Sequence, residues 1–129
     1  MIIGIGVDIV DLDRVQRMID RHGKRFLART FTDDEIAYCL SRKLPTQHFA
    51  ARFAAKEAAF KAFGTGWRQG LGWKEVEVRA SQLGQPHIHL SGRAAVMARD
   101  MGITDMLVSL SHCNCHAIAQ VIATGPATR

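Results

Sequence analysis

Residues 53–64 read FAAKEAAFKAFG, a helix-forming segment that is apolar nearly all the way round yet carries three charges. The pattern predicts a long helix over about 47–63, and a helix that is apolar on every face is normally buried. Burying Lys56, Glu57 and Lys61 costs free energy unless each charge has a partner. The three charges therefore either satisfy one another or form a site that waits for a ligand.

Glu57 and Lys61 are four residues apart, so their side chains are neighbours on one flank of the predicted helix. The simpler interpretation is a structural ion pair, which contributes only about 0.2–0.5 kcal/mol on a helix surface. So small a gain is a poor reason to keep two charges on a mostly buried helix. This consideration favours a functional site over the structural pair.

A second carboxylate lies in the segment 2–10, IIGIGVDIV, which is short, apolar and β-branched and predicts a buried strand. Asp8 is unexpected there because Asp is disfavoured in strands and costly to desolvate. If this strand meets the long helix, Asp8 and Glu57 jointly bind a divalent cation such as Mg²⁺. This ion prefers one or two carboxylates and fills its other positions with water and substrate phosphates. Lys61 would then contact a phosphate or a leaving oxygen. Spacing alone leaves open whether the two carboxylates meet.

The remaining elements alternate irregularly between helical and strand patterns. Helices are expected over about 12–21, ended by Gly23, over 32–41, where Thr32 and Glu35 form a capping box, and over 91–101. Strands are expected over 73–80 and 86–90, followed by a hairpin of 105–112 and 116–123 around the Cys113–Asn114–Cys115 turn. Because strands and helices mix without regular β-α-β alternation, we predict an α+β fold in one domain spanning residues 1–129.

Composition restricts the class of protein. The 129 residues are 47% hydrophobic and 22% charged, which is typical of a globular protein, and the net charge of +5 favours an acidic partner or substrate. The cysteines number three, so they do not form a disulfide framework, and a reducing, cytoplasmic setting is expected. No apolar run approaches the roughly 20 residues that cross a bilayer, and we expect no membrane partner.

Three segments resemble a known family. GVDIVDLDRV at 6–15 and RFAAKEAAFKAFGTG at 52–66 are similar to the two signature motifs of the holo-acyl-carrier-protein synthases, the short bacterial-type 4′-phosphopantetheinyl transferases. LSHCNCHAIAQVIA at 110–123 resembles their closing hairpin, although its CNC turn departs from the usual family pattern. The resemblance therefore covers nearly the whole chain.

This resemblance implies a fold, a reaction and an assembly. The fold is a mixed, mostly antiparallel sheet packed around a long central helix. The reaction transfers 4′-phosphopantetheine from coenzyme A to a serine of apo-acyl carrier protein in fatty acid synthesis, and releases adenosine 3′,5′-bisphosphate. Asp8 and Glu57 match the Mg²⁺ ligands of the family, and Lys61 matches its lysine. Glu57 is the candidate for deprotonating the serine. The assembly is a homotrimer with coenzyme A sites between subunits.

Coenzyme A needs contacts beyond the metal. Backbone N–H groups of the glycine-rich segment 64–72, at Gly64 and Gly66, are candidates for phosphate binding, although a plain connection explains the segment equally well. The 3′-phosphate needs cations, for which Arg52 and Lys56 on the long helix, or the pair at 42–43, are candidates. His112 is expected either to contact the substrate or to be structural.

Basic residues also follow one face of the first predicted helix. Arg14, Arg17 and Arg21 share that face, and Lys24 and Arg25 lie just beyond it. By itself such a stripe is most simply a solvated surface. Because acyl carrier proteins are acidic, the resemblance makes it the expected docking surface for the carrier, with Phe26 as an apolar anchor.

Two other classes of protein stay open at this point. A small basic nucleic-acid-binding module would explain the net charge, but it leaves Asp8 and Glu57 without a role, and the chain has no recognised nucleic-acid motif. We therefore expect no nucleic-acid partner. Another Mg²⁺-dependent phosphohydrolase would explain the carboxylates but not the basic face.

Overall fold

The structure is a computed structural model that describes residues 1–64 and 70–127. Its strands form two antiparallel sheets. The first has the order β1 (Ile2–Asp11), β5 (His116–Thr124), β4 (Asp105–His112), and the second pairs β2 (Val76–Ala80) with β3 (Pro86–Leu90). The helical elements are α1 (Leu12–Thr30), α2 (Asp33–Leu40), α3 (Pro45–Ala62), the 3₁₀ turn η2 (Trp73–Glu75) and α4 (Gly92–Asp100). Within the described residues, no helix is both long enough and apolar enough to span a membrane.

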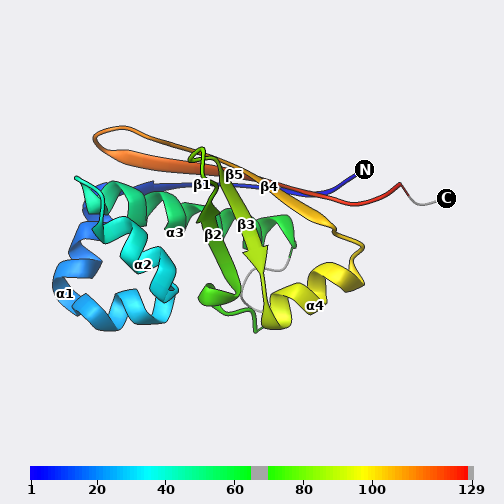
Figure 1. Cartoon of the computed structure of the whole chain (residues 1–129), viewed down its shortest axis with the longest axis horizontal. Helices are drawn as coiled ribbons and strands as arrows, with labels where there is room; N and C mark the ends of the chain where they lie inside the picture. Colours follow the sequence, from blue (N-terminus) through cyan, green and yellow to red (C-terminus); the bar gives the residue numbers. More distant parts are fainter. Residues whose placement is uncertain (65–69, 128–129) are drawn as a thin grey trace.

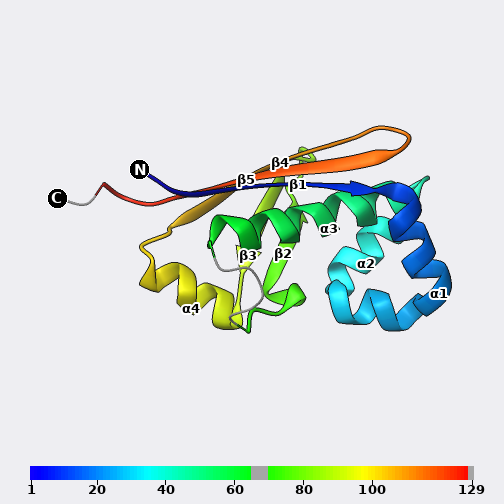
Figure 2. The ribbon, with the colours of Figure 1, turned by 180° about the vertical axis from the view of Figure 1, so that it is seen from behind.

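The long helix α3 is central to this arrangement. It lies along one face of the first sheet, with α1 and α2 near one end and α4 near the other (Figure 1). Seen from behind, α3 runs beneath β1 and β5 (Figure 2). The α+β class and the central helix are therefore confirmed. The strands belong to two separate antiparallel sheets, whereas the resemblance implied one mixed sheet.

Most predicted boundaries hold to within two residues. The hairpin of β4 and β5 and the short strand β3 are where the sequence placed them. Helix α3 begins at Pro45 rather than at 47, because proline at the first helical position gives up an N–H that has no intrahelical partner. The strand expected over 73–80 begins only at Val76, since residues 73–75 form η2.

The first helix is longer than predicted. Gly23 does break it, with φ 51 and ψ −129, but helical turns resume beyond this kink and continue to Thr30. The second part buries Phe26, which is 1% exposed. Its ring centroid lies 6.0 Å from that of Phe31 and 6.4 Å from that of Phe53. Phe26 is thus a core residue and not the apolar anchor for the carrier that the sequence suggested.

Strand β1 approaches α3 more closely than any side chain would allow. A Cβ atom on Gly4 would lie 2.0 Å from the carbonyl oxygen of Ala62, and one on Gly6 would lie 1.9 Å from that of Ala58. Side chains alternate between the two faces of a strand, so Asp8 follows Gly4 and Gly6 on the face toward α3. The glycines therefore determine how closely Asp8 approaches the helix that carries Glu57 and Lys61.

Lys56, one of the three charges of the central segment, is fully buried. Its Nζ donates to Glu35 Oε1 at 2.9 Å and to the carbonyl oxygens of Trp73 and Val76 at 3.0 and 2.6 Å. Glu35 Oε2 accepts in turn from the N–H of Val78 at 2.9 Å. Burial lowers the pKa of Lys56, and the Glu35 carboxylate opposes that shift. This ion pair joins α2, α3, η2 and β2 inside the core.

We expect Gly6→Ala to destabilise the protein strongly, because the added methyl group would overlap the Ala58 carbonyl oxygen. Overpacking a well-packed contact costs about 1–3 kcal/mol, and the backbone atom here cannot rotate away. The free energy of unfolding, measured by urea denaturation, should fall by about 3 kcal/mol.

Gly72→Ala is the matched control. Gly72 has a φ of −92, and its added Cβ would meet only the Glu75 side chain at 3.5 Å, an ordinary contact. Its stability should change by less than about 0.5 kcal/mol. If Gly6→Ala unfolded at the same urea concentration as the wild type, the close approach of β1 and α3 would not be required.

Candidate functional site

Asp8, Glu57 and Lys61 come together where β1 packs on α3. Lys61 Nζ lies 3.1 Å from Asp8 Oδ1 and donates to the backbone carbonyl of Val7 at 2.9 Å. Lys61 therefore pairs with Asp8 of β1 and not with Glu57. The structural Glu57–Lys61 ion pair considered from the sequence is not formed. The Lys61 side chain is 54% exposed, and its ammonium group is accessible to a ligand.

The Glu57 carboxylate is partly buried, and within the described residues it has no hydrogen bond or ion pair. Burial raises the pKa of Glu57, the nearby Asp8 charge raises it further, and Lys61 and Arg14 oppose the shift. Two neighbouring carboxylates whose charges repel each other suit a divalent cation. Mg²⁺ takes one or two carboxylates and leaves its other positions to water and phosphate oxygens, so Asp8 and Glu57 fit it.

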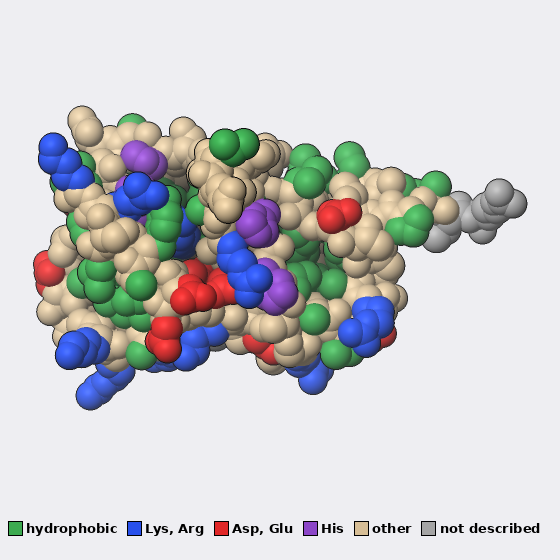
Figure 3. Space-filling model, viewed as in Figure 1, with side chains coloured by type: hydrophobic (Ala, Val, Ile, Leu, Met, Phe, Trp, Pro, Cys, Tyr) green, Lys and Arg blue, Asp and Glu red, His purple; other side chains and the backbone are tan. Residues whose placement is uncertain are grey.

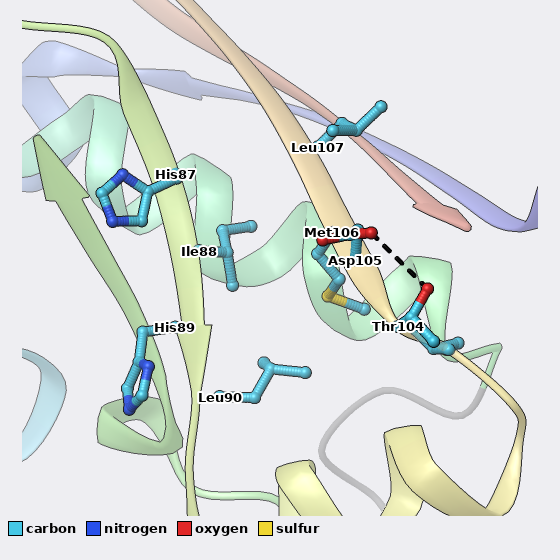
Figure 4. A pocket seen from close by; sticks show the side chains of 9 residues that line it. His87, Ile88, His89, Leu90, Thr104, Asp105, Met106 and Leu107 are labelled. Carbon is cyan, nitrogen blue, oxygen red and sulfur yellow. Dashed lines mark hydrogen bonds between the residues drawn. The ribbon is translucent and has the colours of Figure 1, made fainter. Parts of the chain in front are cut away.

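A pocket of about 370 Å³ lies elsewhere, between β3 and β4, and none of the predicted site residues that the structure describes lines it. Figure 4 shows Ile88 and Leu90 facing the gap toward β4 while His87 and His89 turn away from it. Thr104 and Asp105 are linked there by a long hydrogen bond of 3.5 Å. This pocket has a largely apolar lining on the β3 side, and we assign it no chemistry.

The pocket beside Glu57 has a different character. It has a volume of about 350 Å³ and lies between α1, α3 and η2. Met18, Phe53 and Trp73 supply apolar walls, whereas Arg14 and Arg29 supply positive charge. Glu57 thus borders a cavity that combines an apolar surface with cations.

A third pocket, of about 380 Å³, contains Arg52 and His112, which are both candidates for contacts with coenzyme A. Arg52 is 4% exposed, yet its Nε has no hydrogen-bond partner among the residues that the structure describes. Its guanidinium lies 4.1 Å from the ring centroid of Tyr38, and that of Arg42 lies 4.5 Å from the same ring. A buried guanidinium with an unsatisfied donor suits an anionic ligand such as a phosphate.

Tyr38 and His48 also line this pocket, and neither was predicted from the sequence. The His48 ring lies 6.0 Å from Tyr38 and 5.9 Å from His112. Burial and the neighbouring positive groups lower the pKa of His48. His48 precedes Arg52 by four residues on α3, a spacing that could have identified it. Tyr38 lies on another helix, and no local pattern connects it with Arg52.

Two further predicted coenzyme A contacts differ in the structure. All three Nζ–H groups of the buried Lys56 have acceptors inside the protein, so no donor is left for a phosphate, and we assign this residue a structural role. The N–H of Gly64 donates to the Lys61 carbonyl at 2.9 Å and is likewise occupied. Gly66 lies outside the described residues.

The predicted basic face is present on α1. Arg14, Arg17 and Arg21 line a shallow hollow of about 200 Å³ together with Met18 and His22. Lys24 and Arg25 are exposed beyond the kink. Figure 3 shows basic side chains along the edge of the molecule where α1 lies. The basic face thus begins at the start of α1, where Arg14 also borders the Glu57 pocket.

We expect the pKa of Glu57 to respond in opposite directions to two substitutions. Asp8→Asn removes the repelling charge and should lower it, whereas Lys61→Met removes an attracting charge and should raise it. NMR titration of ¹³C-labelled glutamate carboxyl groups measures both shifts. Asp13→Asn, an exposed residue in the first turn of α1, is the control and should leave the pKa of Glu57 unchanged. An unchanged pKa in Asp8→Asn would show that the two carboxylates do not interact.

Comparison with known proteins agrees with the predicted family. Residues 4–104 match the model of the 4′-phosphopantetheinyl transferase superfamily. A holo-[acyl-carrier-protein] synthase of Trichlorobacter lovleyi is 47% identical over 98% of this chain and 100% of its own length.

Two crystal structures of the same kind of enzyme have similar folds. The holo-[acyl-carrier-protein] synthase of Neisseria meningitidis has a TM-score of 0.89 at 33% identity, covering 96% of this chain and 99% of that one. The Helicobacter pylori enzyme, in complex with coenzyme A, has a TM-score of 0.83 at 30% identity, covering 93% and 99%. The chain therefore belongs to the 4′-phosphopantetheinyl transferase superfamily and is an enzyme of this type.

Proposed function

We propose that this enzyme transfers 4′-phosphopantetheine from coenzyme A to a serine hydroxyl of an apo-acyl carrier protein of fatty acid synthesis, in the cytoplasm. The other product is adenosine 3′,5′-bisphosphate. The observation that carries the proposal is the convergence of Asp8, Glu57 and Lys61 at the β1–α3 contact. Relatives named holo-[acyl-carrier-protein] synthase, and solved neighbours in complex with coenzyme A, support this reaction.

In this proposal Asp8 and Glu57 hold Mg²⁺. When bound, the ion would neutralise charge on the pyrophosphate of coenzyme A, which is the main requirement of phosphoryl-type transfer. The Val7 carbonyl and Asp8 hold the Lys61 ammonium beside the carboxylates. From there Lys61 stabilises the negative charge that grows on the leaving phosphate. Glu57, directly or through a water molecule, also accepts the proton of the attacking serine.

The nucleotide part of coenzyme A needs a second group of residues. The Arg52–His112 pocket supplies cations for the 3′-phosphate, but it is separate from the pocket beside Glu57. Arg52 and Glu57 are five residues apart on α3, which rotates their side chains by roughly 140° around the helix axis. Within one chain the two groups therefore face different sides.

We propose that a homotrimer unites these two groups, with each active site shared between neighbouring subunits. The support is an exposed apolar surface on the face of the first sheet that points away from α3. It consists of Ile5, Val7, Ile9, Leu107 and Ile118, which are 40–61% exposed. An exposed apolar surface of this kind marks an interaction site. A second copy placed there would supply the missing half of the site.

The acidic carrier protein is proposed to dock on the arginine face of α1. Arg14 borders both this face and the Glu57 pocket, so a carrier bound to α1 would present its serine near the carboxylates. Complementary charge would raise the association rate and orient the carrier.

An activity assay tests the assignment of Asp8 and Glu57 as metal ligands. Incubation of the protein with coenzyme A, Mg²⁺ and an apo-acyl carrier protein should add the mass of phosphopantetheine to the carrier, as measured by mass spectrometry. Asp8→Asn and Glu57→Gln keep the side-chain size but remove ligand charge, so the transfer rate should fall about 100-fold or more. Asp13→Asn is the control and should retain the wild-type rate.

Two results would contradict this assignment. A near-normal rate in Asp8→Asn or Glu57→Gln with Mg²⁺ present would show that the substituted residue is not a metal ligand. Cleavage of the coenzyme A pyrophosphate without any carrier would replace the transferase proposal with the phosphohydrolase alternative.

Charge reversal tests the docking surface. Arg21→Glu should raise the KM for the carrier about five- to tenfold, because exposed ion pairs contribute about 0.2–1 kcal/mol and reversal adds repulsion. The KM for coenzyme A should stay constant. Arg99→Glu reverses another exposed charge, on α4, and is the matched control. Equal effects of the two variants would show that the α1 arginines are an ordinary solvated surface and not a docking site.

A further inference from the structure

The turn between β4 and β5 carries two thiols that the proposed reaction does not use. Cys113 and Cys115 are separated by Asn114 and are both exposed, whereas Cys39 is buried in the core. The CNC sequence of this turn departs from the usual pattern of the family. The turn therefore places two accessible thiols close together on the surface.

Cys113 and Cys115 are close enough in the chain for a disulfide to join them. The N–H of Cys113 donates to the carbonyl of His116 at 2.9 Å, and the chain bends at Asn114 and Cys115. Residues two apart are separated by at most about 7 Å even in an extended chain, and a bend brings them closer. Disulfides join Cα atoms that are about 4.4–6.8 Å apart. No large backbone movement is needed to join Cys113 and Cys115.

The turn also distinguishes the three thiols by reactivity. Hydrogen bonds from the backbone of Cys115 and His116 lower the pKa of Cys113. Burial raises the pKa of Cys39 to about 12. Because the thiolate is the nucleophile in thiol–disulfide exchange, Cys113 is the favoured attacking group and Cys39 is inert. Cys115, two residues away, is the only other thiol that can resolve a mixed disulfide at Cys113 within the same chain.

We propose that Cys113 and Cys115 form a reversible dithiol–disulfide pair that exchanges with small disulfides such as glutathione disulfide. The Cys113 thiolate attacks one sulfur of glutathione disulfide, which forms a mixed disulfide and releases one glutathione thiolate. The Cys115 thiolate then attacks the Cys113 sulfur and releases the second glutathione. The protein loses two electrons and two protons, and one glutathione disulfide becomes two thiols. This inference does not depend on the proposed transferase reaction.

The position of the pair connects it with the rest of the molecule. The Cys115 carbonyl accepts from the N–H of Leu12 at 2.9 Å, and His116 Nε2 lies 2.9 Å from Asp11 Oδ1. The turn therefore contacts the junction of β1 and α1, and it directly follows His112 of the Arg52 pocket. Both thiols are exposed, and exposed disulfides are the more easily reduced ones, which suits a labile pair better than a structural bond.

Mass spectrometry of the full-length protein tests the pair. Reduced wild type treated with glutathione disulfide should lose the mass of two hydrogen atoms, remain a single chain, and regain that mass on reduction. Peptide mapping should join Cys113 to Cys115 and leave Cys39 as a free thiol. Cys115→Ser should instead retain one glutathione at Cys113. Cys113→Ser should add glutathione at Cys115 more slowly, because it removes the thiol whose lowered pKa makes it the favoured attacking group.

Three results would overturn the proposal. They are a stable glutathione adduct on the wild type, a disulfide-linked dimer in place of the internal bond, and no change in mass under conditions where an unfolded control of the same chain is oxidised. Each would show that the turn does not bring its two thiols together.

Discussion

The close packing of α3 on β1 is the contact on which the rest of the structure depends. Gly4 and Gly6 leave no room for a side chain against the carbonyl oxygens of Ala62 and Ala58. Because the strand lies so near the helix, Asp8, the next residue on the same face, reaches Lys61 at 3.1 Å and raises the pKa of Glu57. A larger residue at either glycine would separate the elements and move the two carboxylates apart. The packing of β1 on α3 therefore also determines the geometry of the site.

The three charges of the central helix have two different roles. Lys56 points inward, where Glu35 and two backbone carbonyls satisfy every donor of its ammonium group. Removing one partner of such a buried pair costs about 3–5 kcal/mol, because the other charge remains buried and unpaired. Glu57 and Lys61 lie toward the surface, and the Glu57 carboxylate is left unsatisfied within the described residues. The buried pair holds the helix, and the charges near the surface form the site.

The periodicity of apolar residues predicted most helices and strands. Asp8 and Glu57 were identified as site residues because their carboxylates lie in otherwise apolar segments. The errors have physical causes. Gly23 indicated the end of a helix, but a kink lets the helix continue and bury Phe26. The acceptors of Lys56 come from residues 17 to 21 positions away in the chain, so no local pattern showed that this lysine was already satisfied. For the same reason nothing near Tyr38 indicated that its ring would stack on Arg52.

The two faces of strand β1 have different roles. From Gly4 to Val10 its even-numbered residues face α3 and include Asp8, while Ile5, Val7 and Ile9 alternate with them and are exposed on the opposite face. Exposing three apolar, β-branched side chains on one face of a strand costs an isolated chain free energy. That cost disappears if another copy of the chain covers them. In the proposed trimer the strand that carries a metal ligand would thus also form the subunit interface. Assembly would then hold the backbone of Asp8 and Val7 from both sides and fix the carbonyl that orients Lys61.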